Sequence, residues 1–338
     1  MTSIIYKSSS RIIQFLCQNG DKDPKHSSSW KHPLSTFLIH YIITTTLIIY
    51  IHDYFLLPPY YLDQSIKTVT KNDKENESKQ IQIANFMFIY FVILLGYRIA
   101  TNNSNRKVQK TILYENTWLC NTTLFMGALG LWTDRHVVVL SHVVAVSIDQ
   151  VLWYVDLTGW VLSGFQKFPI GVAKYITWPQ TSWATRITCT HHVWTIPLLI
   201  YACNGFQYPI HTYILSGFVI VINVCTSRWL TPFTVHVIHN EDEVNHYKKK
   251  DLVQNTVSSQ QSQSQSQLVY KYLNVNLSHE LWKDITSSFS ILQIKYDNPG
   301  TAVYLFRLLW RWQLFNGVVF VVVLHPLSKY FFLNGAYE

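Results

Sequence analysis

The chain has 338 residues, of which 49% are hydrophobic and only 14% are charged, against roughly 25% charged residues in an ordinary soluble domain. Apolar blocks alternate with short polar ones, which is the composition of a polytopic membrane protein. The formal net charge of +8 fits an excess of Lys and Arg in cytoplasmic loops. No basic stripe with interleaved aromatic side chains occurs outside the apolar blocks, so nucleic acid is not expected as a partner.

The cysteines argue against a disulfide framework. Their number, five, is odd, no two of them have the CxxC spacing, and four lie inside apolar runs. They are Cys17, Cys120, Cys189, Cys203 and Cys225. The first thirty or so residues are polar, and no cleavable signal peptide is expected.

Seven apolar segments predict an all-α, polytopic integral membrane protein with about seven transmembrane helices, within a range of six to eight. A transmembrane helix needs about 20 mostly apolar residues. The predicted spans are Leu34–Leu57, Ile81–Ala100, Ile112–Trp132, His136–Phe165, Thr185–Gly205, Pro209–Leu230 and Gly300–Leu324. Between the fourth and fifth spans, Phe168–Trp183 contains two prolines and is interpreted as an interfacial or re-entrant connection. Arg98, near the end of the second span, is expected to reach outward to the interface.

The segments order the chain into four parts. Residues 1–33 form an N-terminal segment, 34–230 the bundle of spans one to six, 231–299 a polar loop, and 300–338 the last helix and tail. The loop contains a Ser/Gln tract, Asn255–Gln267, that is expected to be disordered. The distribution of Lys and Arg predicts a cytoplasmic N-terminus and a C-terminus across the membrane. An endomembrane such as the endoplasmic reticulum is favoured over the plasma membrane.

Two carboxylates, Asp149 and Asp156, lie inside the fourth apolar segment. They are seven residues apart, about two helical turns, and so share one face of a helix. Each costs roughly 2.5–3.5 kcal/mol near the centre of a membrane helix. They are therefore expected either to pair with cations from another helix or to line a polar cavity.

Counting 1.5 Å per residue from the predicted cytoplasmic ends places several polar side chains at one depth. About 10 Å below the boundary lie a thiol, a carboxylate, two imidazoles and a guanidinium. They belong to Cys120, Asp156, His191, His192 and Arg307, with Arg311 one turn deeper on the same helix and Asp149 two turns deeper than Asp156.

The polar side chains at this depth can be interpreted in two ways. The Asp and Arg side chains are either an inter-helix ion-pair network that holds the bundle together or the lining of a functional pocket. Cys120 is either inert packing or a nucleophile activated by an imidazole of the fifth span. The histidines lack a second well-spaced ligand set, so no metal and no cofactor is expected.

Three short blocks in the chain resemble the transmembrane protein 164 family of polytopic acyltransferases and its bacterial relatives. The first is GYRIAT (Gly96–Thr101) followed by ENTWLCNTTL, with its cysteine early in the next span. The second is the Phe168-Pro169 connection with THHVWTIPLLIY (Thr190–Tyr201). The third is DNPGTAVYLFRLLWRWQ (Asp297–Gln313). The likeness covers about residues 86–325.

The resemblance implies a seven-helix fold and transfer of a fatty acyl chain between glycerophospholipids through an acyl-cysteine. Cys120 matches the acyl-accepting cysteine, and His192, or else His191, matches the histidine of the fifth span. Asp297, Pro299 and Arg307 match the Asp-Pro and Arg pattern at the last helix. Where the family has a histidine after the cysteine, this chain has Asn121, and its polar loop is longer. Either departure fits a protein that kept the fold and changed the chemistry.

Three functions follow as hypotheses. The first is a lipid acyltransferase or thioesterase with membrane lipids as partners and a phospholipid or lysophospholipid as substrate. In it Cys120 attacks, His191 or His192 is the base, and Asp149, Asp156, Arg307, Arg311 and Asn121 line the substrate site. The second is a transporter of a small solute or proton along an Asp/Arg network, although no internal repeat supports a carrier. The third is a non-catalytic membrane scaffold.

Overall fold

The apolar segments fold as helices because a bilayer offers no water to backbone N–H and C=O groups, which must be satisfied within the segment. The computed structural model describes residues 32–56, 71–101, 106–178, 181–204, 206, 208–232, 234–238, 268–272, 275–277 and 302–327. Its longest helices are α2 (Pro33–Ile51), which continues as the π-helical turn η1 (His52–Leu56), α3 (Lys71–Thr101), α6 (His136–Leu162), α9 (Ile210–Leu230) and α12 (Ala302–Val319), which continues as η7 (Phe320–Leu324).

The shorter elements connect these helices. They are α4 (Arg106–Glu115), α5 (Leu119–Trp132), the 3₁₀ turn η4 (Lys174–Thr177), α7 (Trp183–Thr188), α8 (His191–Ala202), the strands β1 (Thr234–Ile238) and β2 (Leu268–Tyr272), and the 3₁₀ turn η5 (Val275–Leu277). The two strands pair antiparallel, with Thr234 opposite Tyr272. The polar loop 231–299 therefore contains a β-ribbon that its composition did not predict.

The prediction of an all-α membrane protein is confirmed apart from this ribbon. Within the described residues, five helical segments are long and apolar enough to cross a membrane. They are Pro33–Leu56, Asn76–Thr101, His136–Leu162, Ile210–Leu230 and Tyr304–Leu327. The predicted count of about seven spans is not confirmed, because the third and fifth segments are each broken into two shorter helices. Helices α5 and α8 have 14 and 12 residues, or about 21 and 18 Å, less than a bilayer core of about 30 Å.

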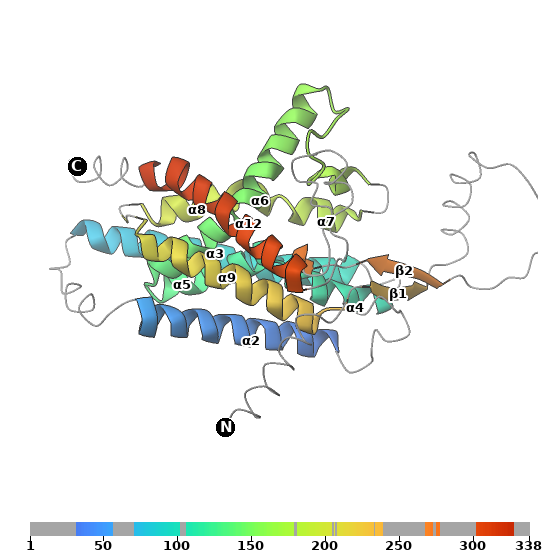
Figure 1. Cartoon of the computed structure of the whole chain (residues 1–338), viewed down its shortest axis with the longest axis horizontal. Coiled ribbons are helices and arrows are strands. Elements are labelled where there is room, and N and C mark those ends of the chain that lie inside the picture. The colour runs from blue at the N-terminus through green and yellow to red at the C-terminus, as the bar shows by residue number, and fades with distance from the viewer. Residues whose placement is uncertain are drawn as a thin grey trace, which may run out of the picture.

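Helix α5 packs between α3 and α6, α6 packs against α9, and α12 crosses over α6 and α9 (Figure 1). Polar side chains form hydrogen bonds between these helices. Such bonds are common in membranes, because lipid tails are as apolar as the helix surfaces and the hydrophobic effect does not drive the helices together. Asn316 of α12 accepts hydrogen bonds from Ser147 Oγ and from the N–H of Ile148, both at 3.0 Å, and donates to the Ala145 carbonyl at 3.0 Å. Gly127 allows the close approach of α5 to Met87 and Leu199, where a Cβ would lie 2.9 and 3.1 Å from their side chains.

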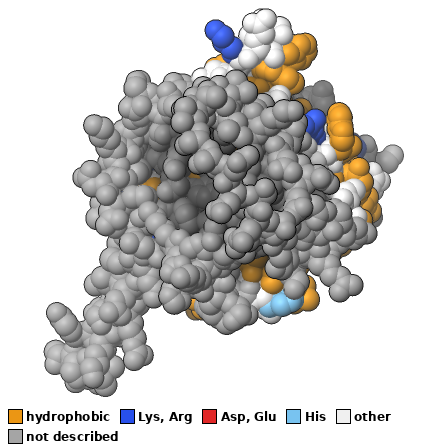
Figure 2. Space-filling model, turned by 90° about the vertical axis from the view of Figure 1, so that its right-hand side faces the viewer, with side chains coloured by type: hydrophobic (Ala, Val, Ile, Leu, Met, Phe, Trp, Pro, Cys, Tyr) orange, Lys and Arg blue, Asp and Glu red, His pale blue; other side chains and the backbone are white. Residues whose placement is uncertain are grey.

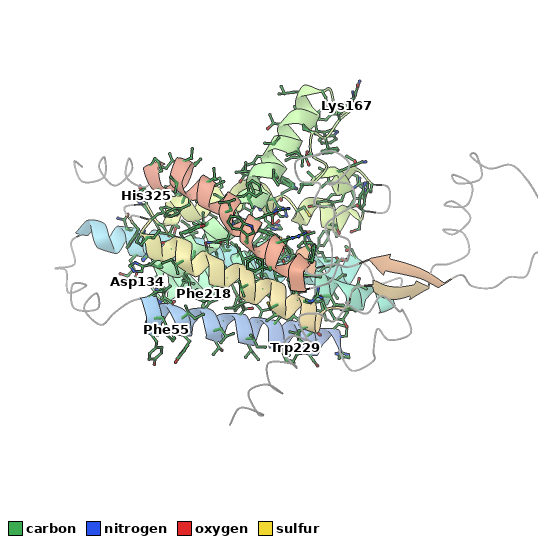
Figure 3. The ribbon with its side chains drawn as sticks, in the orientation of Figure 1. Phe55, Asp134, Lys167, Phe218, Trp229 and His325 are labelled. Atoms are coloured by element: carbon green, nitrogen blue, oxygen red, sulfur yellow. The ribbon has the colours of Figure 1, made fainter. Side chains whose placement is uncertain are left out.

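Large apolar side chains cover the outside of the bundle. Phe55, Ile42, Phe306 and Val322 are among the most exposed, and Phe55 points outward from the end of the first span in the stick view (Figure 3). Seen from the end of the bundle that carries the β-ribbon, the described side chains at the rim are mostly hydrophobic, with a few Lys, Arg and His (Figure 2). Such a belt is what a bilayer requires of a spanning protein.

The end of the bundle opposite the β-ribbon has an ion pair. Arg135, in the turn between α5 and α6, contacts both carboxylate oxygens of Asp53 at 3.1 and 3.0 Å, and Nδ1 of His52 lies 2.6 Å from the same carboxylate. Asp134 and Phe55 mark this end in Figure 3. The contact fixes the last turn of the first span to the α5–α6 turn.

Several predictions fall on residues outside the described ranges. These are the N-terminal segment up to residue 31, Cys17, the Ser/Gln tract 255–267, and Asp297 and Pro299.

Candidate functional site

The third apolar segment breaks at Asn116, Thr117 and Trp118, between α4 and α5. Asn and Thr side chains offer the backbone local hydrogen bonds that compete with a helix. Thr117 Oγ1 donates to the Tyr114 carbonyl at 2.7 Å, and the Asn121 amide donates to the Glu115 carbonyl at 3.2 Å.

Other elements satisfy the remaining backbone groups of this break. The Tyr41 hydroxyl of α2 donates to the Asn116 carbonyl at 2.9 Å. Asn276 of η5, in the left-handed region at φ 54°, accepts from the Leu119 N–H at 2.7 Å and donates to the Thr117 carbonyl at 3.0 Å. Unsatisfied groups at a buried helix end cost stability, so this network is what makes a helix start possible inside the bundle.

The fifth apolar segment breaks at Cys189 and Thr190, between α7 and α8. The Thr188 carbonyl, freed by the break, accepts from Nδ1 of His191 at 2.6 Å and from the Tyr90 hydroxyl at 3.0 Å. Thr190 Oγ1 donates to the Ile187 carbonyl at 2.7 Å. Helix α8 therefore starts, like α5, inside the protein.

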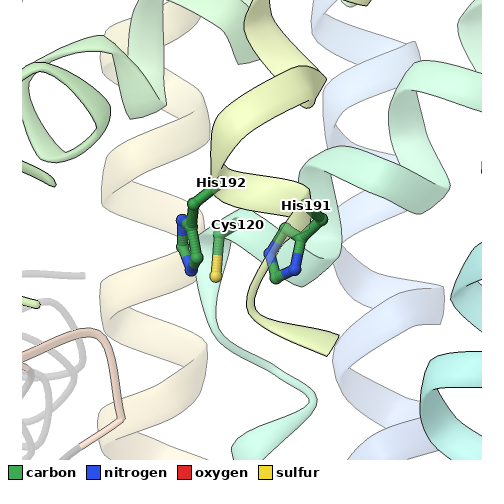
Figure 4. A group of neighbouring side chains, drawn as sticks. All are labelled: Cys120, His191 and His192. Carbon is green, nitrogen blue, oxygen red and sulfur yellow. The ribbon is translucent and has the colours of Figure 1, made fainter. Parts of the chain in front are cut away.

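The two breaks bring together one cysteine and two histidines. Cys120 is the second residue of α5, and His191 and His192 are the first two of α8. The Cys120 sulfur and one nitrogen from each imidazole all lie within 4.8 Å of one another. In Figure 4 the thiol lies between the two rings, which point toward it. The ring centroids of the two histidines are 4.2 Å apart.

Neighbouring groups fix the orientation of both imidazoles. His191 uses Nδ1 for the Thr188 carbonyl, and its Nε2 is buried with no hydrogen-bond partner among the described residues. His192 has its Nδ1 2.6 Å from the amide nitrogen of Gln150, and its ring stacks on Trp153 with centroids 5.2 Å apart. Because Nδ1–H donates to a carbonyl, neutral His191 has its lone pair on Nε2.

The Cys120 thiol has donors and charges around it. It accepts a hydrogen bond from the backbone N–H of Asn121, and both Asp149 and Arg98 lie within electrostatic range of it. A thiolate at a helix N-terminus is stabilised by exposed N–H groups and by the helix dipole. Burial and the nearby Asp149 carboxylate oppose the thiolate, so the thiol needs a neighbouring base to take its proton.

Arg98 is the cation of the site. Its side chain is buried at 7% exposure, and it donates to Thr188 Oγ1 at 2.6 Å and to Cys189 Sγ at 3.6 Å. The expectation that Arg98 reaches outward is therefore wrong. Tyr175, from the connection after α6, donates to the same sulfur at 3.1 Å. Burial raises the pKa of Tyr175 well above its ordinary value, so its hydroxyl remains a donor.

Asp156 has a different environment from the one expected of a substrate ligand. It is fully buried, and it accepts from the N–H groups of Ile170 and Gly171 at 2.7 and 3.0 Å and from Ala173 at 2.8 Å. Its counterpart is thus the backbone of the connection after α6 and not a cation. Asp156 shapes this connection, which in turn supplies Tyr175.

The structure does not bring the arginines of α12 into the cluster. Arg307 is exposed and Arg311 partly exposed, and among the described residues neither forms a hydrogen bond or ion pair with Asp149 or Asp156. Asn121 is buried and belongs to the α4–α5 break, where its Oδ1 has no described partner. Of the predicted site residues, Cys120, His191, His192, Asn121 and Asp149 thus lie together.

Sequence reasoning missed several residues of this site: Arg98, Gln150, Trp153, Tyr175 and Asn276. Gln150 and Trp153 carried a usable signal, since they lie one position and one turn from Asp149 on the same helix. Asn276 carried none, because it comes from a polar loop 157 residues away from its partner Leu119.

An apolar groove lies next to the break. It has a volume of about 440 Å³ and lies between α2, α3 and α5. Its lining residues are Phe37, Leu38, Tyr41, Ile42, Thr45, Thr46, Phe91 and Phe125. Tyr41 connects it to the site, because its hydroxyl binds the Asn116 carbonyl four residues before Cys120 and lies within electrostatic range of the thiol.

Comparison with known proteins assigns no family to this arrangement. No protein-family model matches the chain, and neither a curated protein nor a solved structure matches it.

Proposed function

We propose that the protein is a membrane-embedded lipid acyltransferase or thioesterase in which Cys120 accepts the acyl chain. The observation that carries the proposal is the approach of the Cys120 sulfur to His191 and His192 within 4.8 Å, at two helix N-termini inside an apolar bundle. A nucleophile next to an oriented base is the arrangement that covalent catalysis needs.

In the first step the thiol attacks the carbonyl carbon of a lipid ester. Nε2 of His191 takes the thiol proton, an S–C bond forms, and the C–O bond to the lipid breaks. The protonated imidazole returns that proton to the leaving alkoxide, which departs as the hydroxyl of a lysolipid. The product on the protein is a thioester at Cys120.

In the second step a hydroxyl group of another lysolipid, or water, attacks the thioester. The imidazole takes the proton of the attacking hydroxyl and returns it to the departing sulfur, so that free Cys120 is regenerated. A lysolipid acceptor makes the protein a transferase, and water makes it a thioesterase.

The surroundings suit this chemistry. His191 is the better base of the pair because the Thr188 carbonyl holds its Nδ1 proton and leaves Nε2 free. The buried Arg98 guanidinium is placed to stabilise negative charge developing on the ester oxygen or to bind a phosphate. The apolar groove beside Tyr41 offers room for an acyl chain without exposing it to water.

The resemblance to the transmembrane protein 164 family predicts the same reaction with phospholipid and lysophospholipid substrates, in an endomembrane. The transporter hypothesis depends on a pairing of Asp149 and Asp156 with Arg307 and Arg311, and this pairing does not occur among the described residues. The scaffold hypothesis predicts no reaction at Cys120, and the labelling experiment that follows distinguishes it from the proposal.

The test is acylation of Cys120. Purified protein incubated with a clickable fatty acyl phospholipid is expected to acquire a label that hydroxylamine removes, as it does a thioester. Cys120→Ala abolishes the label, and His191→Ala slows labelling by about 10²- to 10⁴-fold, the usual contribution of a general base. Cys225→Ala, which removes a thiol of α9, leaves it unchanged. Equal labelling of wild type and Cys120→Ala contradicts the proposal.

A further inference from the structure

The Cys120, His191 and His192 cluster also has the composition of a metal site. A thiolate and two imidazoles are ligands that Zn²⁺ prefers. In a tetrahedral zinc site the donor atoms stand about 3.3–3.8 Å apart, as follows from bond lengths of about 2.0–2.3 Å. The three donor atoms here lie within 4.8 Å of one another, so a contraction of about 1 Å closes the set.

The groups that hydrogen-bond to the two histidines are also of the kind found around a metal site. A zinc-bound histidine usually donates its other ring N–H to a carbonyl or carboxylate, which fixes the ring. His191 does so with the Thr188 carbonyl and keeps a buried, unpartnered Nε2. The Gln150 amide lies 2.6 Å from Nδ1 of His192, and its Oε1 has no described partner. Turning that amide by 180° makes Oε1 the acceptor for Nδ1–H and leaves Nε2 of His192 for a metal.

Charge balance also favours a divalent cation at this place. A zinc ion bound by one thiolate and two neutral imidazoles has a net charge of +1, which is costly in an apolar bundle. The Asp149 carboxylate, within electrostatic range of Cys120, offsets that charge. Three protein ligands leave the fourth position open to water or another small ligand.

We infer that Cys120, His191 and His192 bind one Zn²⁺ ion, and that the bound ion blocks the thiol. Binding displaces the thiol proton, which passes to solvent. The metal site rests on the ligands and their surroundings and does not depend on the proposed function. Its regulatory consequence, that zinc and an acyl chain compete for Cys120, rests on the proposed function. A metal was not expected from the sequence, since the third ligand, Cys120, comes from a helix about seventy residues before the two histidines.

The test is cobalt spectroscopy on the full chain in detergent after treatment with a chelator. Co²⁺ is expected to bind in one equivalent and to give thiolate-to-cobalt charge-transfer absorption, which Zn²⁺ then displaces. Cys120→Ser removes this absorption. Gln150→Ala, behind the ligand His192, weakens Co²⁺ binding by about 10- to 100-fold, the usual effect of removing such a group. Cys225→Ser, at a free thiol of α9 outside the cluster, is the control and retains the absorption.

The outcomes separate the two proposals. No Cys120-dependent absorption at any Co²⁺ concentration overturns the metal site, whether or not Cys120 is acylated. Absorption without acylation retains the metal site and dismisses the acyltransferase. If both occur, stoichiometric Zn²⁺ is expected to suppress acyl labelling and a chelator to restore it. Labelling that is unaffected by bound zinc refutes the competition.

Discussion

Hydrogen bonds from neutral groups surround the buried Asp156 carboxylate, and hydrogen bonds to neutral groups hold the buried Arg98 side chain. Asp156 accepts three backbone N–H groups, and Arg98 donates to a hydroxyl and a sulfur. A buried ion pair must offset the desolvation of two ions, whereas one charge surrounded by backbone donors needs no second desolvated ion. This explains why depth and charge alone predicted an Asp–Arg network that the described residues do not form.

Asp156→Asn is expected to loosen the connection after α6. The amide keeps one acceptor oxygen but places N–H donors where a carboxylate oxygen accepted the Ala173 N–H. Each lost hydrogen bond of this kind costs about 1–3 kcal/mol, so local opening becomes roughly tenfold or more frequent. The measurement is the rate of tryptic cleavage after Lys167 and Lys174, which flank the segment and are exposed. Lys167 lies just beyond the C-terminal end of α6 (Figure 3).

A matched control for this change is Asp134→Asn. The side chain of Asp134 is 88% exposed, and the ion pair that it forms with His136 is at the surface, where such pairs contribute little. Cleavage at unchanged rates in Asp156→Asn shows that the connection does not depend on the carboxylate.

The two broken helices are the elements that create the site. An unbroken helix hides its N–H groups in its own hydrogen bonds, and only a helix start exposes them. Helices α5 and α8 both start inside the bundle, and their first turns contribute Cys120, His191 and His192. Half-helices of this kind are a known means of building a polar site inside an apolar membrane protein.

Asn276 is expected to stabilise the start of α5 from outside that helix. Asn276→Ala leaves the Leu119 N–H and the Thr117 carbonyl without their partner, and it places an alanine at φ 54°. Together these effects are expected to lower stability by about 2–4 kcal/mol and to slow alkylation of Cys120. Thermal unfolding in detergent and thiol-labelling rates measure the two effects.

Asn276→Gly separates the two causes, because glycine tolerates the left-handed backbone while lacking the side chain. Its unfolding temperature is expected to fall between those of wild type and Asn276→Ala. Asn204→Ala, at an exposed asparagine in another loop, is the control and changes neither measurement. If Asn276→Ala unfolds and reacts with thiol reagents like the wild type, Asn276 does not stabilise the start of α5.

At the scale of the whole molecule, the sequence predicts the class of fold but not its interruptions. Apolar composition over windows of about 20 residues identifies spans, and it does so correctly for the five long helices. The same averaging hides a break of two or three residues, such as Asn116–Trp118. A common depth predicts which helices bring Cys120 and the histidines near one another. It does not predict Asn276 or Arg98, whose partners are fixed only by tertiary packing.

The predicted orientation is testable on sealed endoplasmic reticulum vesicles. The balance of Lys and Arg predicts that residues 231–299 face the cytoplasm and that residues 58–70 do not. Trypsin added outside is therefore expected to cut at Lys248–Lys250 and to spare Lys67 until detergent opens the vesicles. Antibody tags in the two segments identify the fragments, and a tag on a resident lumenal protein reports leakage. Immediate cleavage at Lys67 reverses the orientation.

The short length of α5 has a consequence for the two leaflets of the bilayer. The helix rises only about 21 Å from the turn at Thr133 to its start, less than a bilayer core of about 30 Å, so Cys120 in its first turn lies off centre, on the side from which α4 leads into α5. In the proposed acyltransferase, a lipid on that side would bring its ester to the sulfur without leaving its own monolayer. A lipid on the other side would first have to be flipped. Remodelling by such an enzyme would make the fatty acid composition of the two monolayers diverge.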